Sequence, residues 1–348
     1  MEEYLFVLGR DHVLSVAELF SYFKRKHIKH ELKYKDSAVA LFLLEKLPNI
    51  NELGGTVKIA KKVDLKSIVP EKNKVLFSFT SVDKKDILLE EVKDFFKSEK
   101  VKAMQKYAQT INIPPSKSGM LDYEFLQFRK RLFQVVSVSN PKGYKERDEN
   151  RPAFDAMKVI SIRLAKILIN LAEAEEEIVD PFCGTGTILQ EAVLLGYKGI
   201  GIDRNIVEAK RNISWLGEHA AQKVRLIEGD ARNISALIKR GEAVVTEPYL
   251  GPYLRKLPSQ GEAKKIIAEL EVLYKHVLKE LAKVISGRVV IILPRIRTFT
   301  QKYGIQEDII GNAGYRPVKL PEGIPNPIFY RKKRSRVERF IYVLEKLK

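Results

Sequence analysis

Cysteine is nearly absent from this sequence of 348 residues, which contains Cys183 alone. A disulfide within the chain and a zinc site built from several cysteines are therefore excluded. No run of about 18 apolar residues occurs, and the first residues do not form a basic segment followed by an apolar one. The five histidines show no metal-ligand spacing. These absences predict a cytoplasmic protein without a membrane segment or a bound metal.

Acidic residues are outnumbered, with 44 Asp and Glu against 62 Lys and Arg, which gives a formal net charge of +18. An excess of this size predicts a polyanionic partner, either a nucleic acid or an anionic membrane surface. The richness in Lys, Glu and Ile is also typical of a heat-adapted charged surface. Of these interpretations, the charge favours a nucleic acid.

The length exceeds the roughly 100 to 200 residues of an average domain and predicts two domains, or one large domain with an appendage. The first part mixes short strand-like runs with amphipathic helices, which predicts small α+β units. Strands are expected at 4–8, 38–43 and 74–79, helices at 15–23 and 84–97, and further apolar runs near Ile111 and at 132–138. The polar segment 140–148 is interpreted as a linker or docking loop.

After this segment, strands and helices alternate. Strands are expected at 177–179, 199–202, 224–227, 243–245 and 288–293, with helices at 155–172, 187–195 and 206–217. This alternation is the signature of a doubly wound parallel sheet, so the fold class is α/β. The last apolar runs, 316–320 and 339–344, predict a closing antiparallel pair.

A glycine turn, Asp180-Pro181-Phe182-Cys183-Gly184-Thr185-Gly186, lies between an apolar strand and a helix. Glycines let the backbone approach a ligand at the carboxyl end of a strand, where open α/β sheets bind their ligands. A dinucleotide site has three spaced glycines and binds a pyrophosphate. Here only two follow a carboxylate, which would repel a pyrophosphate and suits the sulfonium and ammonium groups of S-adenosylmethionine.

Two further aspartates follow the next strands. Asp203 lies where an acidic group accepts hydrogen bonds from ribose hydroxyls, and Asp230 ends the third strand, where a carboxylate can accept from an adenine amine. Either residue by itself is as well explained as a turn or helix-cap aspartate. Three acids at successive strand ends favour a cofactor site.

The fourth strand leads into Glu247-Pro248-Tyr249-Leu250-Gly251-Pro252-Tyr253. A carboxylate followed by proline and aromatic residues can hold an exocyclic amine while a ring stacks on the base. We therefore assign Glu247, Pro248 and Tyr249 as catalytic candidates and Tyr253 as an RNA contact. The alternative is a proline-rich surface loop.

The glycine turn resembles the cofactor motif of the THUMP-containing tRNA guanosine-N2 methyltransferases, and 151–154, 163–165 and 170–172 resemble the segment that precedes it. The resemblance covers about 145–250. It implies S-adenosylmethionine as cofactor, tRNA as partner and a class I, Rossmann-like methyltransferase domain. The cofactor-binding residues that it implies, together with the strand-end acids, are Asp180, Pro181, Gly184, Thr185, Gly186, Asp203 and Asp230.

By the same resemblance, residues 1–65 correspond to a ferredoxin-like unit, 66–145 to a THUMP-like RNA-binding domain and 146–348 to the methyltransferase domain. The implied reaction is methylation of the exocyclic N2 amine of a guanosine, with position 10 favoured. The family usually has Asp-Pro-Pro-Tyr-Gly where this chain has Glu247-Pro248-Tyr249-Leu250-Gly251. The base that is methylated stays open for that reason, and the alternatives are adenine-N6 methylation of RNA or DNA and a non-catalytic RNA-binding protein.

Two further features concern the RNA and the cysteine. The basic run Arg331, Lys332, Lys333 and Arg334, between the last two strands, is expected either to contact RNA phosphates or to form a solvated hairpin. Cys183 lacks an evident general base, so we interpret it as a small packing residue and not as a nucleophile.

Overall fold

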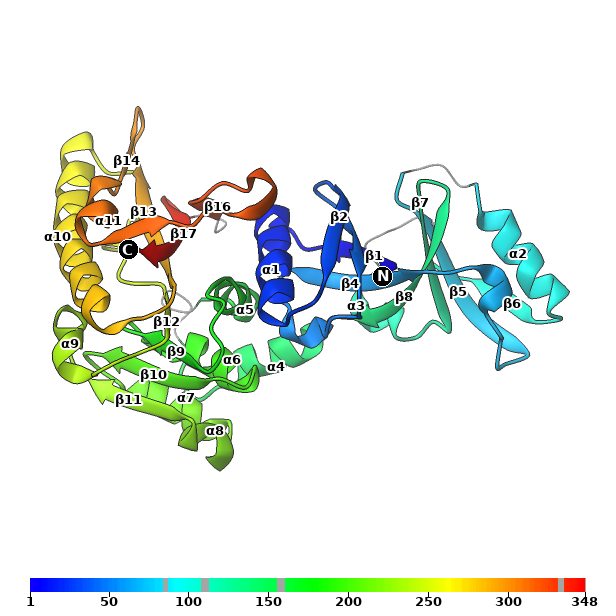
Figure 1. Ribbon diagram of the computed structural model, residues 1–348, viewed down its shortest axis with the longest axis horizontal. Coiled ribbons are helices and arrows are strands. Elements are labelled where there is room, and N and C mark those ends of the chain that lie inside the picture. Colours follow the sequence, from blue (N-terminus) through cyan, green and yellow to red (C-terminus); the bar gives the residue numbers. More distant parts are fainter. Residues whose placement is uncertain (84–86, 108–112, 155–159, 331–334, 348) are drawn as a thin grey trace. The chain divides into compact units, whose positions relative to one another are not determined.

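The computed structural model describes residues 1–83, 87–107, 113–154, 160–330 and 335–347 (Figure 1). The chain divides into two compact units. Unit 1 comprises Met1–Val16 and Lys26–Arg147, and unit 2 comprises Ala17–Arg25 and Asp148–Lys348. Among the described residues, no helix is long and apolar enough to cross a membrane.

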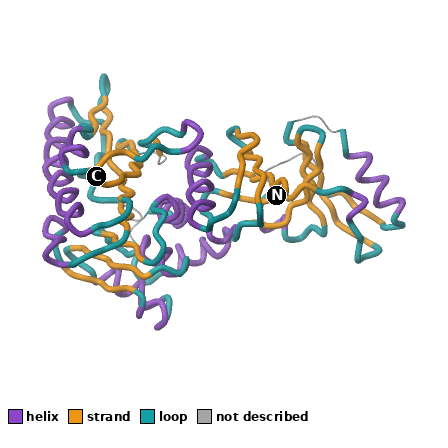
Figure 2. The backbone as a smooth tube through the Cα atoms, in the orientation of Figure 1, coloured by secondary structure: helices purple, strands orange, loops and turns teal. Residues whose placement is uncertain are grey.

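Unit 1 contains an eight-stranded sheet with the order β2-β3-β1-β4-β8-β7-β5-β6. Figure 2 draws the strands in orange. Its strands are β1 (Glu2–Leu8), β2 (His30–Lys35), β3 (Val39–Leu44), β4 (Thr56–Lys62), β5 (Lys74–Ser81), β6 (Lys102–Gln105), β7 (Tyr123–Phe128) and β8 (Arg131–Val138). The described helices of this part are α1 (His12–Arg25), α2 (Leu89–Ser98), α3 (Pro115–Ser118) and α4 (Pro141–Asn150). Residues 1–65 and 66–145 share the sheet because β4 pairs with β8. Their assignment as ferredoxin-like and THUMP-like domains stays a prediction.

A buried ion pair lies within the sheet of unit 1. Lys58 on β4 and Glu124 on β7 are 0% and 4% exposed, and the Lys58 ammonium donates a hydrogen bond to Glu124 Oε1. Ser118 Oγ of α3 donates to the other carboxylate oxygen. Burial lowers the pKa of Lys58, and the hydrogen bond to Glu124 opposes this shift. The pair and the serine satisfy one another and join α3 to the sheet.

Unit 2 contains a second sheet, with the order β11-β10-β9-β12-β13-β17-β15. Its strands are β9 (Glu177–Asp180), β10 (Lys198–Asp203), β11 (Val224–Glu228), β12 (Ala243–Thr246), β13 (Val289–Arg297), β15 (Tyr315–Pro317) and β17 (Val337–Lys346). The strands from β9 to β13 are parallel, and β17 is antiparallel to both β13 and β15. Two short strands, β14 (Lys302–Gly304) and β16 (Ile328–Tyr330), pair with β13 and β17. The expected doubly wound sheet and its closing antiparallel pair are confirmed.

In its described residues, unit 2 contains one helix before the parallel strands, several that connect them and one that follows β14. They are α5 (Ile162–Leu171), α6 (Thr187–Leu194), α7 (Val207–Trp215), α8 (Glu218–Gln222), α9 (Ile234–Leu237), α10 (Gln260–Val284) and α11 (Asp308–Asn312). The long helix α10 is not among the elements expected from the sequence. It begins with a capping box between Ser259 and Glu262, which satisfies backbone N–H groups at its start.

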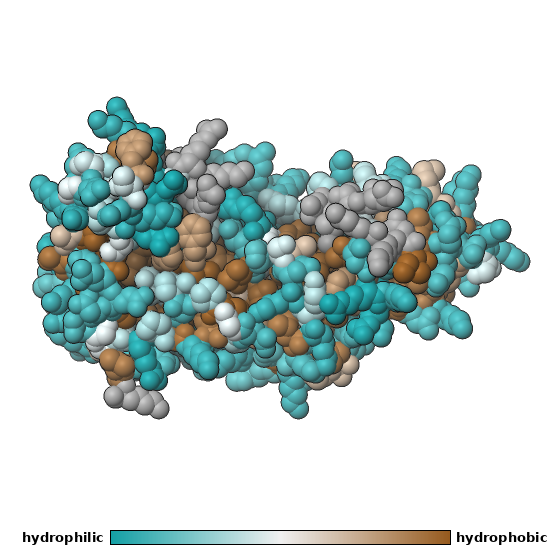
Figure 3. Space-filling model, turned by 90° about the horizontal axis from the view of Figure 1, so that it is seen from above, coloured by the Kyte–Doolittle hydropathy of each residue, from teal (hydrophilic) through white to brown (hydrophobic). Residues whose placement is uncertain are grey.

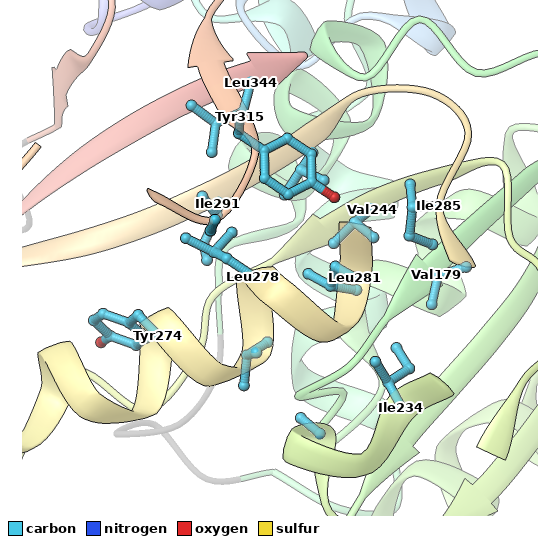
Figure 4. Packing of buried hydrophobic residues seen from close by; sticks show 14 of the residues in the cluster. Val179, Ile234, Val244, Tyr274, Leu278, Leu281, Ile285, Ile291, Tyr315 and Leu344 are labelled. Atoms are coloured by element: carbon cyan, nitrogen blue, oxygen red, sulfur yellow. The ribbon is translucent and has the colours of Figure 1, made fainter. Parts of the chain in front are cut away.

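The core of unit 2 forms where α10 covers the sheet. Tyr274, Leu278 and Leu281 recur on one face of α10, and they pack with Val244 of β12 and Ile291 of β13 (Figure 4). The parallel strands are apolar on both faces because helices cover them. This packing fixes the carboxyl ends of the strands, from which the candidate site is built.

The interpretation of 140–148 as a loop is wrong, because α4 occupies this segment. Asn140 Oδ1 accepts a hydrogen bond of 3.0 Å from the Gly143 N–H, so Asn140 caps the helix and Pro141 occupies its first position. The polar composition indicated solvent exposure and not the absence of a helix. Of the helix expected at 155–172, Ile162–Leu171 is helical, and 155–159 lies outside the described residues, as does Ile111.

Candidate active site

The carboxyl ends of β9, β10 and β12 meet at one edge of the parallel sheet. Asp180 ends β9, Asp203 ends β10, and Glu247 follows β12 directly. A cleft of about 730 Å³ opens at this edge, with a volume in the range of small-molecule sites. Among the predicted residues, those that line it are Pro181, Gly184, Asp203, Asp230, Glu247, Pro248, Tyr249 and Tyr253. The acids that are dispersed in the sequence therefore lie around one cavity.

Asp180 lies behind the cleft wall and is 2% exposed. Its Oδ1 accepts hydrogen bonds from Thr246 Oγ1 at 2.7 Å and from the Phe182 N–H at 3.1 Å. Burial raises the pKa of this carboxyl to about 7, and the charges of Asp203 and Glu247 add to the shift. A cation in the adjoining cleft would favour the ionised form.

The glycine turn follows Asp180 closely. Gly184 and Gly186 have φ values of +50° and +79°, which glycine adopts without strain. Gly186 is the N-cap residue of α6, and a Cβ at this position would lie 3.3 Å from the Cβ of Ala209. Thr185 is buried, and its hydroxyl lies 3.3 Å from that of Thr187. Gly184 lines the cleft, whereas Thr185 and Gly186 are not among its lining residues and contribute to the conformation of the turn.

Cys183 is 5% exposed and packs with Leu189, Ala209 and Ile213. Burial raises the pKa of its thiol. A thiolate is the nucleophilic form of cysteine, and this environment disfavours it. The geometry supports the packing role that we inferred from the sequence.

Asp203 reaches back to the glycine turn. Its Oδ2 accepts a hydrogen bond of 2.9 Å from the Gly184 N–H, and its Oδ1 accepts one of 3.2 Å from the Asn205 N–H. A carboxylate has about four acceptor positions, so each oxygen retains capacity for a ligand hydroxyl.

Both carboxylate oxygens of Asp230 accept hydrogen bonds from arginines. Its Oδ1 accepts from the backbone N–H of Arg232 at 2.9 Å and from Nε of the same residue at 3.0 Å. Its Oδ2 accepts from Nη2 of Arg232 at 2.7 Å and from Arg204 at 2.7 and 3.2 Å. These bonds lower the pKa of Asp230. An adenine amine could bind Asp230 only if Arg204 moved, a condition that the sequence did not indicate.

Glu247 forms an ion pair across the cleft edge. Its Oε1 accepts a hydrogen bond of 2.6 Å from Nε of Arg339, and the two side chains are 16% and 11% exposed. Arg339 lies on β17 opposite Pro294 of β13. Sequence reasoning missed Arg339 because no motif surrounds it. The pair holds the Glu247 carboxylate by one oxygen.

The loop after Glu247 exposes two aromatic rings. Tyr249 and Tyr253 are 57% and 67% exposed. The buried Tyr274 hydroxyl donates a hydrogen bond of 2.6 Å to the Tyr249 carbonyl, which fixes the backbone of the loop while the ring stays accessible. The predicted basic contacts Arg331, Lys332, Lys333 and Arg334 lie outside the described residues.

Two family models match the chain. Residues 150–309 match the model of the RMKL-like methyltransferase domain. Residues 65–211 match a model described as a DNA methylase. The first match includes the glycine turn, Asp203, Asp230 and Glu247.

Curated relatives align with parts of the chain. The tRNA (guanine(10)-N2)-dimethyltransferase of Pyrococcus abyssi is 31% identical over 210 residues, which is 59% of this chain and 55% of the relative. The protein of the same name from Methanothermobacter thermautotrophicus is 35% identical over 122 residues, which is 34% of this chain and 35% of the relative. The alignments thus span about half, or less, of the length of these relatives.

Among solved structures, TrmN from Thermus thermophilus has a TM-score of 0.50 and 14% identity, with 99% of this chain and 100% of that chain covered. At this identity the likeness concerns the fold. The class I, Rossmann-like fold expected from the sequence is confirmed.

Proposed function

We propose that the chain transfers a methyl group from S-adenosylmethionine to the exocyclic N2 amine of a guanosine in tRNA. The match of residues 150–309 to the model of the RMKL-like methyltransferase domain supports methyl transfer. The curated relatives support the proposed substrate, and by their names position 10 is favoured. The observation that carries the proposal is the position of Glu247 at the edge of the cleft that Asp203 also lines.

The strand-end residues fit S-adenosylmethionine. Phe182, Ala231 and Leu254 provide apolar walls for an adenosine, and Asp203 retains acceptor capacity for its ribose hydroxyls. The buried Asp180 supplies negative charge behind the expected position of the sulfonium and ammonium groups. When bound, the cofactor supplies an electrophilic methyl group on a positively charged sulfur.

We expect Asp203→Ala to weaken S-adenosylmethionine binding by roughly 10- to 150-fold, because hydrogen bonds to a charged acceptor contribute about 1.5–3 kcal/mol. Isothermal titration calorimetry would measure the dissociation constant. Asp308→Ala, which removes an exposed aspartate of α11, is the matched control. An unchanged dissociation constant for Asp203→Ala would show that the ribose contact is misplaced.

Glu247 is the proposed acceptor for the target amine. Arg339 occupies Oε1 by a hydrogen bond of 2.6 Å, and Oε2 can accept an N–H of the amine. An amine conjugated to a purine is a poor nucleophile, so the contribution of Glu247 is to orient its nitrogen toward the methyl group and to stabilise the positive charge that develops there. We assign Arg339 as a positioning residue, since its Nε holds the Glu247 carboxylate.

The surroundings of the site suit an RNA substrate. The accessible rings of Tyr249 and Tyr253 are placed to stack on a base. The net charge of +18 supports attraction to phosphates. The basic run 331–334 and the THUMP-like part at 66–145 are further proposed contacts. We place the reaction in the cytoplasm, in agreement with the low cysteine content.

Adenine-N6 methylation of RNA or DNA is the second candidate. The match of residues 65–211 to a DNA methylase model favours it, and an acid followed by proline and an aromatic residue can hold either amine.

Incubation of the protein with labelled S-adenosylmethionine and unmodified bulk tRNA should yield N2-methylated guanosine. Mass analysis of the digested nucleosides distinguishes this product from N6-methyladenosine. Methylation of adenine alone would contradict the proposed base. Cofactor binding without incorporation into bulk tRNA would favour another RNA or the non-catalytic interpretation.

A further inference from the structure

A short hairpin, formed by the end of β13 and by β14, extends the sheet of unit 2 (Figure 1). Ile296 at its base is buried with Ala263 and Ile267 of α10. Its turn is closed by a hydrogen bond of 2.9 Å from the Thr298 N–H to the Gln301 carbonyl, and the Thr298 hydroxyl accepts one of 3.0 Å from the Gln301 N–H. The hairpin is therefore anchored at its base and closed at its tip.

Phe299 lies at the tip and is 86% exposed. The adjoining Thr300 accepts a hydrogen bond of 2.8 Å from Gln260 at the start of α10. The turn is thus held while the ring next to it stays in solvent. A large apolar ring displayed on an ordered turn can bind a partner with little loss of conformational entropy.

The hairpin lies beside the wall of the catalytic cleft. The Arg297 N–H donates to the Arg336 carbonyl at 3.3 Å, and Arg336 lines the cleft. Among the described residues, no carboxylate pairs with the guanidinium of Arg297 or Arg336. Phe299 follows Pro294, the partner of Arg339 in the sheet, by five residues, or roughly 15 Å of extended chain. A nucleic-acid strand whose target base enters the cleft can therefore extend to Phe299 at the tip of the hairpin.

We propose that the β13–β14 hairpin is a contact for single-stranded RNA, in which Phe299 stacks on an unpaired base near the target nucleotide while Arg297 and Arg336 face the phosphates. The inference rests on the proposed function. Proteins bind single-stranded nucleic acids through basic surfaces that lie next to accessible aromatic rings. Hydrophilic residues cover much of the face drawn in Figure 3. Arg297 precedes Phe299 by two residues and supplies positive charge near the ring.

Replacement of Phe299 tests this contact. Phe299→Ala should weaken binding of a labelled single-stranded RNA of about 12 nucleotides by roughly 5- to 150-fold, because one base–aromatic stack contributes about 1–3 kcal/mol. Fluorescence anisotropy would measure the dissociation constant. Phe299→Trp keeps the stacking surface and should bind like the wild type. The control is Val272→Ala on α10, where another apolar side chain is 72% exposed.

The same variants are assayed for methyl transfer to tRNA. Phe299→Ala should raise KM for tRNA and leave both kcat and S-adenosylmethionine affinity unchanged. If wild-type protein methylates tRNA but RNA affinity and KM are insensitive to Phe299→Ala, the hairpin contact is overturned and the proposed function stands. If RNA affinity depends on Phe299 without any methyl transfer, the contact stands and the proposed function fails. Loss of self-association in Phe299→Ala at unchanged RNA affinity would make the tip a protein contact and overturn the inference.

Discussion

Methyl transfer should be about 100- to 1000-fold slower in Glu247→Ala, while affinity for S-adenosylmethionine stays that of the wild type. The loss removes the only acceptor that we assign to the target amine, and deletion of one preorganised group that stabilises developing charge typically has this effect on kcat. Glu247 is not among the residues that we assign to the cofactor, so the cofactor contacts are expected to be retained. Single-turnover kinetics with tRNA and calorimetry with the cofactor measure the two quantities separately.

Glu345→Ala is a matched control, because Glu345 also forms an ion pair with an arginine, Arg316, but on the exposed edge of the sheet. It should leave kcat unchanged. Near-normal kcat in Glu247→Ala would rule out the amine-holding role.

Arg339→Gln separates positioning from general destabilisation. It should lower kcat about tenfold with little change in KM for tRNA, since only the orientation of Glu247 is lost. In the Glu247→Ala background, Arg339→Gln should have little further effect on kcat, because the two residues act as one unit. Additive effects would show that Arg339 acts independently of Glu247.

Lys58→Met should lower the free energy of unfolding of unit 1 by about 3–5 kcal/mol, because it leaves the Glu124 carboxylate buried without its cation. Both residues are buried, with residue exposures of 0% and 4%. The double variant Lys58→Met/Glu124→Leu should recover most of this loss, since a buried ion pair and an apolar pair of similar volume are often equally stable. Urea unfolding of the full chain, monitored by hydrogen exchange of the amides in β4 and β7, would measure the change in the free energy of unfolding.

Lys72→Met is the control for charge removal, because Lys72 forms an exposed pair with Asp122. The expected cost is below about 1 kcal/mol. A Lys58→Met variant as stable as the wild type, or a double variant no better than the single one, would contradict the assigned role of the buried pair.

The strand-end acids could be predicted from the sequence because they depend on one rule. Parallel strands place their carboxyl ends at the same edge, so Asp180, Asp203 and Glu247 converge once the βαβ alternation is recognised. The glycine turn is equally local, since the positive φ values of Gly184 and Gly186 are properties of adjacent residues.

Other parts of the site have no local signal. Arg339 is 92 residues from Glu247 and reaches it only because β17 is antiparallel to β13. Arg204 follows Asp203 in sequence, yet its bond to Asp230 depends on the parallel pairing of β10 and β11. The helix α4 was misread because its polar residues share their composition with loops.

The sequence by itself determined the alternation of strands and helices, the order of the strand-end acids and the resemblance in the glycine turn, because these depend on residues that are close along the chain. Only the tertiary structure decided which of these carboxylates have oxygens free to bind a ligand. It paired Glu247 with Arg339, enclosed Asp230 between two arginines and buried Asp180 so that its pKa rises to about 7. Hydrogen-bond partners and burial depend on residues brought together by packing, and no local pattern specifies them.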